Sequence, residues 1–286
     1  MTATLRLESG DSACVIAPAM GGAIISLQLE GVAVFREAPP NCADILQTAC
    51  FTMVPFGNRL VSGEIRGGRR LALPPDPAAH PHALHGHGWR QAWTVLYRAA
   101  DSVTLGLTHS ADAWPWPYRV EQQFALRAGA LRIALVVTNL SSDAMPCGFG
   151  IHPYFTLEPS SFVESNADRC LAPDKRGVPS RIAPWPPGRI ALATAPPCDH
   201  FLLDNGGSII VGTDCWRLAI RASEVMGWQL YRPPSGAYFC VEPVSHLPNQ
   251  LDNFIAAGER GKAASLRWDV EVELTSSEVL ERRSPI

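Results

Sequence analysis

The chain has 286 residues and a formal net charge of −3, with 47% hydrophobic and 18% charged residues. This balance is typical of a globular protein rather than a disordered one. The length suffices for one large core, although it would also allow two domains. The sequence shows neither a basic field for nucleic acid nor a polybasic stretch for a membrane surface. A neutral or polar small molecule is therefore the expected partner.

The N-terminal region does not resemble a targeting signal. Residues 12–28 carry no charge, but Pro18 and the glycine pair 21–22 interrupt them, and acidic residues precede them. A secretory signal needs a basic start and an unbroken apolar core, and no stretch is long and apolar enough to span a membrane. The eight cysteines are scattered without a CxxC pair, as expected for free thiols in a reducing compartment. We predict a cytoplasmic protein.

Strand patterns dominate the chain. Apolar residues alternate with others in segments 103–107, 131–137, 216–220 and 266–274, which predicts half-buried antiparallel strands. With 25 prolines and 23 glycines, few windows allow three helical turns. The best helix candidates, 41–50 and 276–284, are short. Many short strands separated by turns favour a β-sandwich or barrel, and we predict an all-β antiparallel protein forming one domain over residues 1–286.

One segment complicates the prediction of a single domain. Residues 172–189 are rich in proline and charge, so they could form a domain linker. Strand patterning resumes after them without a change of composition. We therefore expect a long loop that crosses the rim of a sandwich.

The stretch "GFGIHPYF", residues 148–155, is the first candidate for chemistry. In an extended segment Phe149, Ile151 and Phe155 share a core face, whereas His152 shares the other face with two glycines and a tyrosine. Glycine inside a strand often marks a close approach of a ligand or of backbone. A half-exposed histidine near a strand end is equally compatible with these eight residues, and taken alone they slightly favour it.

Glu242 ends an apolar run in "YFCVEPV" and is followed by proline, as is His152. A carboxylate there is either exposed at the rim or held in place for a purpose, because burying it unpaired is costly. Two ionisable groups at strand ends could form an acid–base pair. The sequence does not show that they meet.

The cluster "HPHALHGHGW" contains His80, His82, His85 and His87. On a strand, the 85–87 pair would direct both rings to one face, as metal ligands often do. The glycines between and after them favour a loop instead. Hydrogen-bond donation to a ligand is therefore the preferred interpretation, and a metal site the alternative.

Further candidates are weaker. Asn58 and Arg59 follow a glycine; Arg59 is a fixed donor for ligand oxygens or a surface charge. Asp199 and Asp204 in "CDHFLLDN" are acceptors for hydroxyl groups or ordinary turn residues. No basic cluster accompanies Arg59, which disfavours a sugar phosphate.

Taken in order, several segments resemble the aldose 1-epimerase (galactose mutarotase) family. They are "ACVIAPAMGGAIISLQLEG", "PFGNRL", "LHGHGWRQAW", "GFGIHPYF", "CDHFLL" and, in the form seen in bacterial members, "FCVEPVSHLPNQLDN". The resemblance spans nearly the whole chain. It implies a large antiparallel β-sandwich, the galactose mutarotase-like supersandwich, and a small aldose as substrate with neither cofactor nor metal.

The resemblance also implies roles for individual residues. His152 would be the general acid and Glu242 the general base for opening the sugar ring, so His152 must be protonated, and we expect a nearby carboxylate to raise its pKa. Sugar-binding positions are implied for Asn58, Arg59, His85 and Asp199. Two alternatives remain: a non-catalytic sugar-binding sandwich, and a metal-dependent enzyme that uses His85, His87 and His152.

Overall fold

A computed structural model describes residues 3–65, 69–204, 206–258 and 263–277 of the chain. Its regular structure is antiparallel β-sheet together with three short 3₁₀ helices: η1 (Ile45–Gln47), η2 (Val61–Gly63) and η3 (Gly88–Arg90). Within the described ranges, no helix is long and apolar enough to cross a membrane. The predicted all-β class is confirmed.

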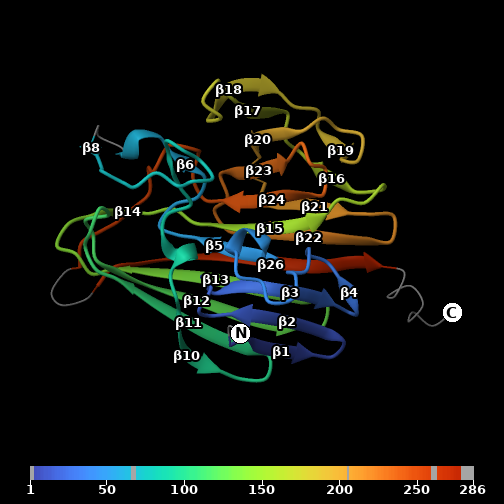
Figure 1. Cartoon of the computed structure of the whole chain (residues 1–286), viewed down its shortest axis with the longest axis horizontal. Helices are drawn as coiled ribbons and strands as arrows, with labels where there is room; N and C mark the ends of the chain where they lie inside the picture. Colours follow the sequence, from blue (N-terminus) through green and yellow to red (C-terminus); the bar gives the residue numbers. More distant parts are fainter. Residues whose placement is uncertain (1–2, 66–68, 205, 259–262, 278–286) are drawn as a thin grey trace.

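The larger sheet has eleven strands and extends from β1, low in Figure 1, to β18 at the top. Its order is β1 (Leu5–Ser9), β2 (Ser12–Ala17), β3 (Ala23–Leu29), β5 (Cys50–Met53), β15 (Gly150–Thr156), β24 (Tyr238–Val244), β23 (Gly227–Arg232), β20 (Cys198–Leu202), β17 (Arg169–Pro173) and β18 (Pro179–Pro184), with β4 (Val32–Ala33) beside β3.

The second sheet has nine strands. Their order is β10 (Thr94–Arg98), β11 (Ser102–His109), β12 (Tyr118–Arg127), β13 (Ala130–Asn139), β26 (Ser265–Ser277), β22 (Trp216–Ala222), β21 (Ser208–Gly212), β16 (Phe162–Ser165) and β19 (Gly188–Ala191). Three short strand pairs complete the described structure: β14 (Met145–Pro146) with β25 (Phe254–Ile255), β6 (Arg59–Leu60) with β9 (Ala83–Leu84), and β7 (Glu64–Ile65) with β8 (Arg69–Arg70).

The two sheets share one hydrophobic core. The apolar positions of the alternating segments point inward, and in β26 Trp268, Val270 and Val272 are at most 1% exposed. Trp268 stacks on Phe149, just before β15, with 6.0 Å between ring centroids. Because Phe149 belongs to the segment that enters the other sheet, this contact joins the layers. Burying each large apolar side chain stabilises the fold by roughly 1.5–3 kcal/mol.

Two predictions about local structure need correction. In segment 41–50 only η1 is helical, begun by Asp44, whose carboxylate accepts from the Leu46 N–H at 3.0 Å. The helix candidate 276–284 is wrong at its first two residues, which end β26, and its remainder lies outside the described residues. The helix is limited to this one capped turn because the chain enters β5 at Cys50, three residues after η1 ends.

Residues 172–189 are neither a linker nor a rim loop. They contain β18, which forms the edge of the larger sheet, and the start of β19, the edge of the other sheet. Proline is tolerated at sheet edges because no ladder partner needs its N–H. Ile182 in β18 is accordingly 64% exposed.

Candidate active site

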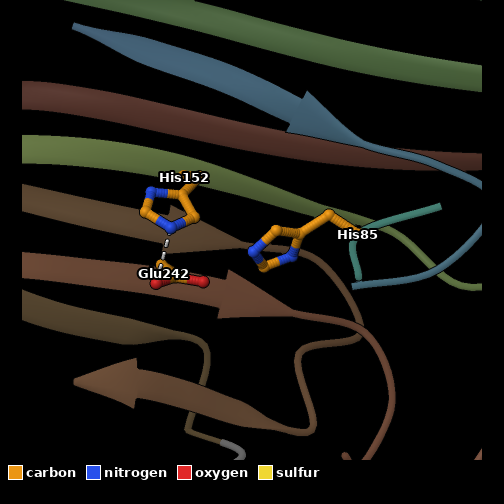
Figure 2. A group of neighbouring side chains, drawn as sticks. All are labelled: His85, His152 and Glu242. Atoms are coloured by element: carbon orange, nitrogen blue, oxygen red, sulfur yellow. Dashed lines mark ion pairs between the residues drawn. The ribbon is translucent and has the colours of Figure 1, made fainter. Parts of the chain in front are cut away.

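Antiparallel pairing of β15 with β24 brings His152 and Glu242 together. The register pairs Gly150 with Val244 and Tyr154 with Cys240, which sets His152 opposite Glu242. His152 Nε2 lies 3.2 Å from Glu242 Oε1, and Figure 2 shows the two groups directed at each other. Both residues are buried, at 7% and 2% exposure.

The imidazole of His152 is held by aromatic rings. Phe51 of β5 stacks on it with ring centroids 4.6 Å apart, and Tyr154 lies at 4.6 Å. Among the described residues, His152 Nδ1 and Glu242 Oε2 are buried without a hydrogen-bond partner. Buried polar atoms are normally paired, so this pair departs from the pattern of an ordinary stable core.

The glycines before His152 make room for protein groups: backbone, as predicted, at Gly150, and a side chain at Gly148. A Cβ on Gly148 would lie 2.1 Å from the His246 ring, and one on Gly150 would lie 2.4 Å from Met53 and 3.0 Å from the Pro243 carbonyl oxygen. They make room for a packed histidine and for β24, not for a ligand above His152.

His152 and Glu242 line a pocket of about 170 Å³. All six residues predicted for the site meet there, although they come from different strands and turns. The pocket is lined by Leu46, Asn58, Arg59, Ala78, Leu84, His85, His152, Tyr154, Asp199, Gln229, Tyr231, Tyr238 and Glu242. Asp204 does not line it, because its carboxylate accepts from the backbone N–H groups of residues 166 and 206.

His85 presents a hydrogen-bond donor to this pocket. Its Nδ1 accepts from the Asn58 backbone N–H at 3.0 Å. A backbone amide can only donate, so the proton of a neutral His85 sits on Nε2. Figure 2 shows the ring edge-on to the His152–Glu242 pair.

The same hydrogen bond bears on the metal alternative. One donor atom each from His85, His152 and Glu242 lies within 4.8 Å of the others, but Nε2 of His85 carries a proton where a metal would need a lone pair. His87 does not join them, since its Nε2 contacts the Tyr118 hydroxyl at 2.8 Å instead. The predicted set His85, His87 and His152 is therefore not assembled, and the donor chemistry favours a hydroxyl ligand over a metal.

A chain of hydrogen bonds orients the sugar-binding candidates. Asn58 Nδ2 donates to Gln229 Oε1 at 2.7 Å, and Gln229 Nε2 donates to Asp199 Oδ1. Asp199 Oδ2 then lies 3.2 Å from the Arg59 guanidinium. The sequence reasoning missed Gln229. Its one signal was a polar residue inside the apolar strand run "GWQLYR", and only the pairing of β23 with β24 and β20 reveals its position.

Burial determines the protonation of the site. It lowers the pKa of His152 to about 3, opposite to the rise we expected. It also raises the pKa of Glu242 well above its ordinary value, an effect that Asp199 reinforces and Arg59 opposes. Burial lowers the pKa of His85 well below its usual range. Burial therefore disfavours both the imidazolium and the carboxylate in the empty site.

Comparison with known proteins shows the family of the chain. The aldose 1-epimerase family model matches residues 3–197. The uncharacterized protein YphB of Escherichia coli K12 is 29% identical over 224 residues, which are 70% of this chain and 74% of that protein.

Two solved structures share the fold. A provisionally assigned aldose 1-epimerase of Escherichia coli K12 superposes with a TM-score of 0.82 at 22% identity, covering 95% of this chain and 98% of the other. A galactose mutarotase-like protein of Clostridium acetobutylicum gives 0.79 at 18% identity, covering 95% and 94%. The family match ends before Asp199, so the pocket geometry alone joins Asp199 and Glu242 to His152. The chain belongs to the aldose 1-epimerase family.

Proposed function

We propose that this protein is a mutarotase, which interconverts the α and β anomers of a free aldose. The observation that carries the proposal is the contact of His152 with Glu242 at 3.2 Å inside a pocket lined by hydroxyl-binding groups. Anomer exchange needs two proton transfers at one hemiacetal. A pair of groups that together hold one proton supplies both.

The reaction uses the pair as acid and base. Glu242, as carboxylate, takes the proton of the O1 hydroxyl while His152, as imidazolium, gives a proton to the ring oxygen. The bond from C1 to the ring oxygen breaks and C1 becomes a carbonyl carbon. After rotation about C1–C2 the ring closes on the other face of C1, and both protons return.

When the sugar binds, it must separate His152 from Glu242, and the proton must move from Glu242 to His152. In the empty site burial disfavours charge on either group, yet imidazolium with carboxylate has the same proton count as the neutral pair. The positive Arg59 favours an ionised Glu242, and sugar hydroxyls would add donors to the carboxylate. The proton then shifts toward His152 without exchange with solvent.

The remaining polar side chains would hold the sugar. Arg59 and His85 are donors, and Asp199 is an acceptor fixed by Gln229. The Arg59 charge is already balanced by Asp199 at 3.2 Å, which favours a neutral aldose over a sugar phosphate. Tyr154, Tyr231 and Tyr238 also line this pocket.

Polarimetry of a freshly dissolved α-anomer tests the proposal across a panel of aldoses. We expect faster equilibration with catalytic amounts of protein, unchanged by EDTA. Saturable sugar binding without acceleration would instead indicate the non-catalytic sugar-binding alternative. Loss of activity in EDTA that Zn²⁺ restores would indicate the metal-dependent one.

A further inference from the structure

A second and larger cavity, of about 640 Å³, lies beside the candidate active site. Its walls are loop 73–77, segment 83–91 and residues 107–114 at the end of β11. It shares Leu84 with the first pocket, but neither His152 nor Glu242 lines it. Its volume falls within the range of roughly 300–1,000 Å³ that is usual for small-molecule sites.

A turn at residues 85–86 places His85 and His87 in different pockets. His85 has φ +58° and Gly86 has φ +67°, two consecutive residues in the left-handed region. A Cβ on Gly86 would lie 2.3 Å from the Val54 carbonyl oxygen, so only glycine fits there. As a result His85 lines the first pocket, whereas His87 lines the second.

Two histidines and a tryptophan contribute to the lining of the second cavity. The rings of His87 and His109 lie 4.3 Å apart. The His87 Nε2 contacts the Tyr118 hydroxyl at 2.8 Å, and no hydrogen bond to its Nδ1 occurs among the described residues. Trp114 also lines the cavity. Its Nε1 is buried and has no hydrogen-bond partner among the residues that the structure describes.

The charges of the lining disfavour an anion. Arg90 donates twice to Asp76 Oδ2, at 2.9 and 2.7 Å, so its charge is balanced. Burial and the neighbouring His109 lower the pKa of His87 to about 4, which leaves it neutral at pH 7. Asp112 is 67% exposed and accepts from the Trp114 N–H with one oxygen, leaving the other for a ligand.

We propose that this cavity binds a neutral carbohydrate, separately from any sugar in the candidate active site. The partly exposed His87 and the exposed Asp112 supply hydrogen-bonding groups for sugar hydroxyls. The exposed prolines of loop 73–77 and the neighbouring Leu107 add apolar surface for the C–H groups of a sugar. The balanced Arg90 leaves no cation for a phosphate group. The inference needs no catalytic role for His152 or Glu242.

Imidazole NMR signals of the full chain test the proposal, with D-galactose and D-glucose as probes. The signals of His87 and His109 should shift saturably with at least one of them, and equally in a His152→Asn variant. Ser110→Trp, at an exposed position on the cavity wall, should weaken these shifts at least tenfold while anomer exchange stays within twofold of wild type. Ser142→Trp, exposed and outside both pockets, should change neither.

Three results would overturn the inference. The first is that the signals of His87 and His109 do not shift at sugar concentrations that saturate the shift of the His85 signal. This result would leave the proposed mutarotase function intact. The second is unchanged binding in Ser110→Trp. The third is tighter binding of galactose 6-phosphate than of galactose at His87 and His109. Shifts at His87 and His109 without any anomer exchange would support this cavity and count against the mutarotase.

Discussion

His152 Nε2 and Glu242 Oε1 lie 3.2 Å apart on neighbouring antiparallel strands, both nearly inaccessible to solvent. Each group also has a second polar atom that is buried without a partner among the described residues. A folded protein rarely keeps such an arrangement without a ligand, because each unpaired buried polar group costs about 1–3 kcal/mol. This arrangement, which costs stability, supports the proposal that the pair serves chemistry.

Glu242→Gln is expected to remove the base and keep the fold. The amide has the same shape and can contact His152, but it cannot take a proton, so kcat should fall by roughly 10²–10⁴-fold. The free energy of unfolding should change little, since the amide is a neutral isostere of the protonated carboxyl and can donate the same hydrogen bond to His152. Polarimetry followed over time measures kcat, and urea denaturation measures the free energy of unfolding. A variant with wild-type kcat would exclude Glu242 as the base.

The rate should not fall when the pH is lowered through the ordinary histidine range. Burial lowers the pKa of His152 to about 3, so the pair gains a second proton only far below neutrality. Burial raises the pKa of Glu242, so the loss of its proton moves to higher pH, not lower. kcat/KM should therefore not decrease as the pH falls from about 7.5 to 5.5, through the ordinary histidine pKa of ~6.5. A decrease toward acid pH within this range would contradict a pair that works with one proton.

Gln229→Glu should impair binding more than chemistry. The new carboxylate can still accept from Asn58 Nδ2, but it replaces the donor to Asp199 with a negative charge. A lost hydrogen bond to a charged group is worth about 1.5–3 kcal/mol, so KM should rise about tenfold or more with kcat within a few-fold.

Gln123→Glu is the matched control for Gln229→Glu. Gln123 lies on β12 in the other sheet, where it accepts from Arg267 at 3.2 Å. KM should not change in this variant. Equal effects of both substitutions would mean that charge in general, rather than the orientation of Asp199, is responsible.

Gly148→Ala should destabilise the protein by crowding His246. The added methyl group would lie 2.1 Å from that ring, whose Nε2 accepts from the Gly57 N–H at 2.8 Å. Overpacking of this kind costs about 1–3 kcal/mol, measurable as a lower midpoint of urea unfolding. In a His246→Ala background the same change should cost clearly less. Additive costs would show that His246 is not the group that requires glycine.

The sequence predicted the parts of the site but not all of their reasons. Alternation placed Phe149, Ile151 and Phe155 in the core, and each is at most 1% exposed. The same pattern misjudged Gly148, because it contains no information about His246 from a distant segment. Gln229 was missed for a similar reason: strand pairing, not local pattern, sets it between Glu242 and Asp199.

The histidine cluster shows a second limit. An HxH pair directs both rings to one face only if the backbone is extended. Positive φ angles at His85 and Gly86 break that condition and send the two histidines into different pockets. The protonation of His152 was also mispredicted, because the degree of burial around an ionisable group is a property of the folded chain.

The most direct measurement is the anomer exchange rate of His152→Asn at saturating aldose and neutral pH, compared with wild type. Asparagine can occupy part of the imidazole site but cannot deliver a proton at this pH. We predict a loss of roughly 10²–10⁴-fold in a variant that remains folded and still binds the sugar. An exchange rate within a few-fold of wild type would contradict the assignment of the His152–Glu242 pair as the catalytic centre.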